Sequence, residues 1–176
     1  MNYPYLTGKT VYLRAMEQDD LEIVTCINNE SNVRIMGDDD APYPLSMKDL
    51  ETFNDQNNEG KNFVIVSVID KKIIGSLAIY AVNHQNLNCE LSIVLSEPFQ
   101  GKGYGREAMD IIIEFIFHYL PMNKIKVQVF SFNSNAISLY KSLGFEHEGT
   151  LKEEIFRFSK FQDLENYALF REKWQK

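Results

Sequence analysis

Residues 99–112, with the sequence FQGKGYGREAMDII, place a cluster of glycines and two cationic side chains directly ahead of an apolar stretch. The glycines stand at positions 101, 103 and 105, and the cations are Lys102 and Arg106. Because glycine has no Cβ, successive backbone N–H groups can point into one concavity. A helix start adds unpaired N–H groups and about half a positive charge. The segment therefore predicts an anion-binding turn, and the alternative is an ordinary strand-to-helix connection.

Two well-known phosphate-binding motifs do not fit this spacing. A dinucleotide fingerprint G-x-G-x-x-G beginning at Gly101 needs glycine at position 106, where Arg106 stands. A phosphate loop G-x-x-x-x-G-K-[ST] ending at Gly101 and Lys102 needs glycine at 96 and Ser or Thr at 103, but Ser96 and Gly103 occupy these positions. Both motifs are excluded.

Metal and serine chemistry are not predicted either. His84, His118 and His147 fall in different predicted elements, without the paired spacing of metal ligands. The G-x-S-x-G elbow of a serine nucleophile is absent from the sequence. We therefore expect no metal site and no serine nucleophile.

The rest of the chain predicts the elements that position the turn. Alternating or apolar runs predict strands at 9–15, 62–69, 73–82, 89–95 and 124–130, with two more near 146–157 and 160–171. Helical spacing predicts helices over 17–29, 47–57, 106–120 and 134–145. Residues 37–45 are predicted as a loop. Ser46 and Asp49 form a plausible capping box, and Gly144 ends the last helix.

This order predicts a single mixed α/β (α+β) domain over residues 1–176. The strand–helix–strand unit at 89–130 should be a right-handed crossover with parallel strands, while the hairpins make the rest of the sheet antiparallel. We expect about six or seven strands flanked by about four helices. Ligands in such sheets bind beyond the carboxyl ends of parallel strands, and the glycine turn lies at that end.

Composition limits the class of protein. The chain has 176 residues, 44% hydrophobic and 24% charged, as is typical of a soluble globular domain. Its net charge of −7 argues against nonspecific nucleic-acid binding. The longest apolar runs, 63–69 and 111–117, are too short to span a bilayer, and residues 1–30 predict no secretory signal. Cys26 and Cys89 form no disulfide framework, which favours a reducing cytoplasm.

Two segments together resemble a known family. Residues 100–105, QGKGYG, resemble the Q/R-x-x-G-x-G/A signature of the GNAT superfamily of acetyl-CoA-dependent N-acetyltransferases. One crossover later, residues 133–145, NSNAISLYKSLGF, resemble the family's N-x-x-A-x-x-x-Y-x-x-x-G-F stretch. The first strand and the tail resemble the RimJ/RimL-like branch, so the resemblance covers essentially the whole chain.

The resemblance implies acetyl-CoA as the acyl donor, with backbone amides of the turn holding its pyrophosphate. The residues implied in binding coenzyme A are Ile93, Val94, Leu95, Gln100, Gly101, Lys102, Gly103, Tyr104, Gly105, Arg106, Asn133 and Tyr140. For Asn133, capping of the following helix is a second explanation, compatible with the first.

The same resemblance implies two catalytic residues. A tyrosine at the spacing of Tyr140 points its hydroxyl at the thioester sulfur, although helix packing alone could account for it. An acid at the position of Glu90 often receives the proton of the substrate amine, directly or through water, although it could simply be solvated. A backbone N–H near Val94 could stabilise the oxyanion. Strand alternation turns Cys89 away from Glu90, which makes an acetyl-cysteine route unfavourable.

The acceptor is less well defined. Asp38, Asp39 and Asp40 lie in the loop expected to line the acceptor site, and DDDAPYP is somewhat similar to the acidic loop of spermidine acetyltransferases. Three adjacent acids are also typical of a plain solvated loop.

The predicted function is N-acetyl transfer to a primary amine by direct attack in a ternary complex. The acceptor would be a small-molecule or peptide amine, such as a polyamine, a protein N-terminus of the ribosomal-protein type or an amine-bearing antibiotic. The alternatives are a non-catalytic acyl-CoA-binding regulatory module and a protein-interaction domain. A homodimer is an expectation by analogy alone.

Overall fold

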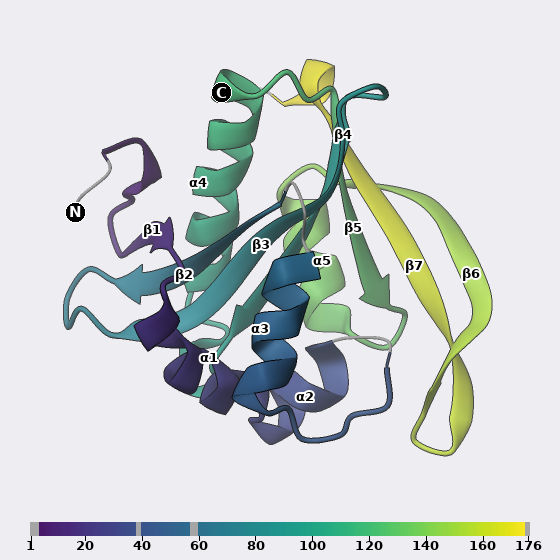
Figure 1. The fold of residues 1–176 in the computed structure, drawn as a ribbon. Helices are drawn as coiled ribbons and strands as arrows, with labels where there is room; N and C mark the ends of the chain where they lie inside the picture. The colour runs from purple at the N-terminus through teal and green to yellow at the C-terminus, as the bar shows by residue number, and fades with distance from the viewer. Residues whose placement is uncertain (1–3, 38–39, 57–59, 175–176) are drawn as a thin grey trace.

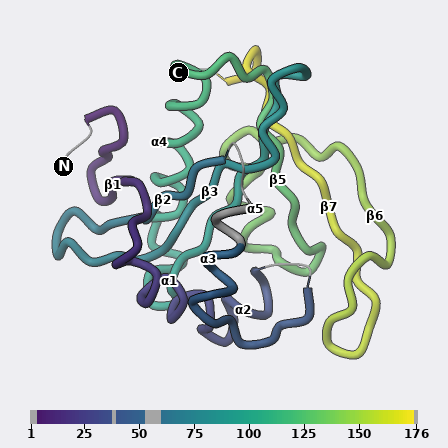
Figure 2. The backbone as a smooth tube through the Cα atoms, viewed as in Figure 1, coloured from purple at the N-terminus to yellow at the C-terminus, as the bar shows by residue number. Residues whose placement is uncertain are grey.

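The protein is built around one seven-stranded sheet (Figure 1). The structure, a computed structural model, describes residues 4–37, 40–56 and 60–174. Along the sheet the strands run β1-β2-β3-β4-β5-β7-β6. Their bounds are β1 Val11–Ala15, β2 Lys61–Ser67, β3 Ile73–Asn83, β4 Asn88–Leu95, β5 Lys124–Phe130, β6 Glu146–Arg157 and β7 Lys160–Phe170. Figure 2 shows β6 and β7 as a long hairpin at one side of the molecule.

Helices flank the sheet. They are α1 Leu21–Asn28, α2 Ser31–Gly37, α3 Met47–Gln56, α4 Tyr104–Tyr119 and α5 Ser134–Ser142. Within the described ranges, none of these helices combines the length and apolar character needed to cross a membrane.

The predicted mixed sheet is confirmed. β4 and β5 are parallel and are joined through α4, whereas the other neighbouring strands are antiparallel. The capping box is confirmed as well, since Ser46 N donates to Asp49 Oδ2 (2.8 Å) and Asp49 N donates to Ser46 Oγ (3.2 Å).

The predicted helices differ from the structure in several places, including α1, which covers Leu21–Asn28 and not 17–29, and α5, which ends at Ser142. The sequence pattern predicted no helix between 29 and 47, yet α2 covers Ser31–Gly37, because seven residues are too few for a clear periodic signal. The helix after the glycine turn begins at Tyr104, two residues before the predicted start at Arg106. The turn is therefore tighter than expected.

The two faces of the sheet bury different helices. Alternate β2 residues show this, because successive side chains of a strand point to opposite faces. Phe63 and Ile65 belong to the main core, which also includes residues of α4 and α5, whereas Val64 and Val66 pack with Val24 of α1. Many residues of α4 are buried in the main core, so the glycine turn is joined to a well-packed helix.

Both ends of α4 are tied to distant parts of the chain. In the first turn, the Glu107 carboxylate accepts hydrogen bonds from Lys9 N and from Thr10 N (3.0 Å) and Thr10 Oγ1. At the other end, the Arg171 guanidinium donates to the carbonyl oxygens of Phe117, Leu120 (2.7 Å) and Met122 (2.8 Å). Arg171 thus satisfies carbonyls that the end of a helix leaves without partners.

Acidification should remove the stabilisation that Glu107 provides. Burial acts to raise the pKa of Glu107, but the hydrogen bonds from Thr10, Lys9 and Val11 together hold this pKa below its ordinary value. The contribution is therefore complete above the unfolded-state pKa, about 4.3, and is lost as the pH falls through the folded-state pKa.

We expect the melting temperature of the wild type to exceed that of Glu107→Gln at neutral pH, and the difference to shrink below about pH 4.3. Thermal unfolding followed by circular dichroism across this range measures the difference. A difference that stays constant with pH would contradict the role given to the carboxylate.

Candidate active site

The parallel strands β4 and β5 are paired only at their beginnings. Their ladder joins Asn88 through Glu90 to Lys124 through Lys126 and includes no later pair. Beyond it, β4 stays paired with β3 up to Leu95, and β5 stays paired with β7 up to Phe130. The two strands therefore diverge toward their carboxyl ends, and we call the space between residues 91–95 and 127–130 the β4–β5 gap.

The backbone of β4 presents alternate residues to this gap. Ser96 N donates to Ile74 O (2.9 Å), so these two opposite residues form a hydrogen-bonded pair. Hydrogen-bonded and non-hydrogen-bonded pairs alternate along an antiparallel ladder. The pair of Ser76 with Val94 is therefore hydrogen-bonded as well. The N–H and C=O of Val94 thus face β3, while those of Ile93 and Leu95 face the gap. This alternation narrows the expected oxyanion donor near Val94 to the N–H of Ile93 or of Leu95.

Two of the three glycines of the turn have a left-handed backbone, whereas Gly105 is a buried residue of α4. After β4 comes one 3₁₀ turn, η3 (Glu97–Phe99), and then Gly101 with φ +69° and Gly103 with φ +90°. These angles lie in the left-handed region that favours glycine. At both positions a Cβ would meet no heavy atom within 4 Å, so the space above the turn is open on the protein side. Such a surface suits a ligand that approaches the backbone closely.

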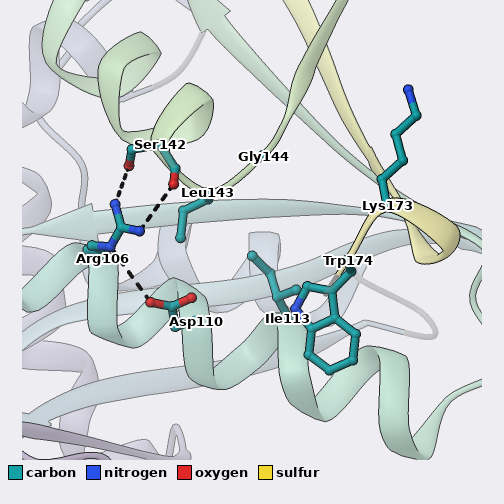
Figure 3. Close-up of a pocket in the computed structure, with 8 residues that line it drawn as sticks. All are labelled: Arg106, Asp110, Ile113, Ser142, Leu143, Gly144, Lys173 and Trp174. Atoms are coloured by element: carbon teal, nitrogen blue, oxygen red, sulfur yellow. Dashed lines mark hydrogen bonds and ion pairs between the residues drawn. The ribbon is translucent and has the colours of Figure 1, made fainter. Parts of the chain in front are cut away.

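The two cations of the turn behave differently. Lys102 is exposed. Arg106 instead donates from Nη1 to Ser142 Oγ (2.6 Å) and from Nη2 to Ser142 O (3.1 Å), and its Nε lies 3.9 Å from Asp110 Oδ2 (Figure 3). Its guanidinium lines a separate cavity of about 300 Å³ between α4, the end of α5 and Trp174. The hydrogen bonds of the Arg106 guanidinium thus connect α4 to the end of α5.

Asn133 caps the helix that follows the gap. Its Oδ1 accepts a hydrogen bond from Ala136 N (3.1 Å) at the start of α5. The capping explanation of this residue is confirmed, and its contact with a ligand stays a prediction.

Tyr140 lies in the main core, on α5. Its side chain is 6% exposed, its ring centroid is 5.7 Å from that of Phe145, and its cluster includes Leu91 of β4 and Val127 of β5. Burial raises the pKa of Tyr140 to about 12. Among the described residues, none forms a hydrogen bond with its hydroxyl. The residue is thus a neutral phenol whose donor remains available.

Glu90 stands at the point where the ladder between β4 and β5 ends. Its Oε1 accepts a hydrogen bond from Lys126 Nζ (2.7 Å), and its side chain is 17% exposed. Sequence reasoning missed Lys126, because the register that sets it beside Glu90 is a tertiary property. The neighbouring Cys89 is fully buried, and burial raises the pKa of its thiol to about 11, so this cysteine is a protonated core residue.

The acidic loop is only partly visible. Asp38 and Asp39 lie outside the described residues, whereas Asp40 is exposed and its carbonyl accepts a hydrogen bond from Arg157 Nη2. Arg157, at the end of β6, is 6% exposed, and its guanidinium lies 5.6 Å from the ring centroid of Phe130. Sequence reasoning also missed Arg157, since a lone arginine in a charged hairpin carries no signal of burial.

Comparison with known proteins places most of the chain in one family. The family described as "Acetyltransferase (GNAT) domain" matches residues 10–146. The chain is 29% identical to spermidine N(1)-acetyltransferase from Vibrio cholerae, covering 92% of this chain and 94% of that protein. It is 28% identical to the uncharacterized N-acetyltransferase YokL from Bacillus subtilis, over 99% of this chain and 98% of the other.

A solved structure resembles the fold closely. It is the crystal structure of spermidine N-acetyltransferase from Vibrio cholerae in complex with CoA and spermine, with a TM-score of 0.85 and 28% sequence identity. The match covers 94% of this chain and 98% of that one.

Proposed function

Because the chain belongs to the GNAT acetyltransferase family, we propose that it transfers the acetyl group of acetyl-CoA to a polyamine, by direct attack in a ternary complex. The family match over residues 10–146 covers most of the chain and makes it an acetyl-CoA-dependent N-acetyltransferase. The polyamine acceptor is supported by similarity along nearly the whole length to spermidine acetyltransferases. The homodimer and the cytoplasmic location stay predictions.

The glycine turn and the edge of β4 fit the acyl donor. The amides of residues 101–106 are proposed to hold the pyrophosphate, with Lys102 adding charge. The left-handed backbone at Gly101 and Gly103 and the open space above them support this placement. The N–H and C=O of Ile93 and the N–H of Leu95 are proposed to bind the extended arm of the donor, as a neighbouring strand would. The C=O of Leu95 already accepts a hydrogen bond from Gln100 Nε2 (2.7 Å).

The acceptor amine must lose a proton before it can attack. With a reference pKa near 10.4, only about one alkyl amine in a few thousand is neutral at pH 7, which corresponds to about 4 to 5 kcal/mol. Glu90 is the proposed acceptor of that proton, directly or through a water molecule. Its contact with Lys126 engages Oε1, so Oε2 is the oxygen assigned to this task.

Tyr140 is proposed to donate a hydrogen bond to the sulfur of the departing thiolate. The Tyr140 pKa of about 12 keeps its hydroxyl protonated at neutral pH. A thiol has a reference pKa of about 8.5, so complete proton transfer to the thiolate would be uphill by roughly 5 kcal/mol. Hydrogen bonding to the developing charge requires no complete transfer. The proposed oxyanion donor is the N–H of Ile93 or Leu95.

The acidic loop is the proposed recognition element for the acceptor. A polyamine carries several cationic amines, and carboxylates at Asp38, Asp39 and Asp40 would attract those that do not react. The net charge of −7 works in the same direction.

A panel of amines tests the acceptor. Release of free coenzyme A thiol should be fastest with spermidine or spermine, and slower with N-terminal Ala or Ser peptides and with aminoglycosides. Replacing Asp38, Asp39 and Asp40 together by Asn should raise KM for the polyamines and leave KM for acetyl-CoA unchanged. A preference for the peptides would contradict the polyamine proposal.

Tyr140→Phe tests the role of the hydroxyl. The change keeps the ring and its packing, so the fold and the affinity for acetyl-CoA should stay near wild type. Loss of a donor to the leaving group should lower kcat by about 10- to 100-fold. Steady-state kinetics and calorimetric titration measure the two quantities. An equal loss of turnover and affinity would mean that the hydroxyl is structural.

Gly103→Ala tests the placement of the pyrophosphate. The left-handed φ of +90° makes alanine unfavourable by about 1 to 2 kcal/mol, although a Cβ would clash with no protein atom. We expect CoA to bind about tenfold more weakly. Gly149→Ala is the matched control, because its Cβ site is also open and it lacks a positive φ. Unchanged CoA affinity in Gly103→Ala would place the pyrophosphate elsewhere.

A further inference from the structure

The short helix α2 lies across the carboxyl ends of β4 and β5. At its start, Asn32 N donates to Glu97 Oε1 (2.8 Å), and Glu97 is the second residue after β4. Toward its end, Met36 packs against the buried cluster that includes Phe130, the last residue of β5. Figure 2 shows α2 at the same end of the molecule as the tip of β5. The helix therefore connects the two strands where they have diverged.

Two carboxylates join α2 to the β4 side. Glu30, just before α2, accepts hydrogen bonds from Ser96 Oγ at Oε1 (2.7 Å) and from Glu97 N at Oε2 (2.6 Å). Glu97 Oε1 in turn accepts a hydrogen bond from Asn32 N in α2. Glu30 thus accepts a hydrogen bond from the first N–H of the turn that contains Glu97, and Glu97 accepts one from an N–H in the first turn of α2. Both are charge-assisted hydrogen bonds. We call this pair the Glu30–Glu97 clasp.

A buried arginine joins α2 to the β5 side. Arg157 Nε donates to Ile35 O (3.3 Å) near the end of α2, and its Nη2 donates to Asp40 O beyond it. The guanidinium also lies over the ring of Phe130. Burying a cation is unfavourable unless hydrogen bonds compensate for lost hydration. Carbonyls of the segment that follows α1 supply part of that compensation.

We propose that the Glu30–Glu97 clasp and Arg157 are positioning residues, which hold α2 as the wall of the acceptor site across the mouth of the β4–β5 gap. This inference rests on the proposed function, in which the amine attacks within that gap. A seven-residue helix has little stability of its own, so its place is set by what fastens its ends. Attack requires reacting atoms held at about 3 to 3.5 Å, and small displacements lower the rate strongly.

Substitution of Glu97 tests the β4 end. Glu97→Ala removes the acceptor for Asn32 N and should raise the KM of the amine about five- to tenfold, with the affinity for CoA changed less than about twofold. Glu97→Gln keeps an oxygen that can accept this hydrogen bond, so its amine KM should return toward wild type. If Glu97→Gln fails to restore KM, the charge itself acts on the amine and the positioning role is wrong.

Substitution of Arg157 tests the β5 end independently. Arg157→Met removes the donors but fills a similar apolar space, so the fold should persist. We expect the same pattern, a higher amine KM with nearly unchanged CoA affinity. If KM and CoA affinity change by the same factor, or if KM stays unchanged in folded variants at both ends, the proposal is overturned.

Glu51→Gln is the matched control for loss of a carboxylate. Glu51 lies on α3, and its Oε1 accepts an exposed hydrogen bond from Gln18 Nε2 (2.6 Å). The amine used is the one that the wild type acetylates fastest in the panel. If that amine is a peptide, the polyamine proposal fails, while the comparison of KM with CoA affinity still decides the role of α2.

Discussion

The early end of the β4–β5 ladder is the constraint on which the site depends. The two strands are paired as far as Glu90 and Lys126, and each then follows its other neighbour. A continuous sheet would satisfy every N–H and C=O of β4 with its own backbone. The divergence instead leaves the N–H and C=O of Ile93 and the N–H of Leu95 without partners in β5, while the C=O of Leu95 accepts a hydrogen bond from Gln100 Nε2. In the proposed function, the acyl donor binds to these backbone groups.

The surroundings of the gap affect the protonation and the orientation of its ionisable side chains. Helix α4 is anchored in the main core, so the turn before it has little freedom to move. Burial keeps Tyr140 a neutral phenol and Cys89 a neutral thiol. The carboxylate of Glu90, in contrast, stands beside an ammonium group at the last pair of the ladder. The apolar interior thus favours the protonated forms of Tyr140 and Cys89, while the ion pair with Lys126 orients Glu90 at the edge of that interior.

Local features of the site could be predicted from the sequence, because they depend on neighbouring residues. The glycine turn before a helix, the Asn133 cap and the strand–helix–strand order are of this kind. The direction of the Arg106 side chain and the partners of Glu90 and Glu97 could not be predicted, since they depend on register and on contacts between distant segments. Helix α2 was missed because it is short and is held by those same distant contacts.

The contact of Arg171 with the end of α4 has a consequence for synthesis on the ribosome. Helix α4 and strand β5 end before residue 131. The carbonyls at the end of α4 have their hydrogen-bond donor in Arg171, and one edge of β5 pairs with β7, so both partners come later in the chain. A nascent chain emerges from its N-terminus and cannot supply these partners until about forty residues later. The hydrogen bonds at the end of α4 and along this edge of β5 are therefore completed only after Arg171 has been synthesised.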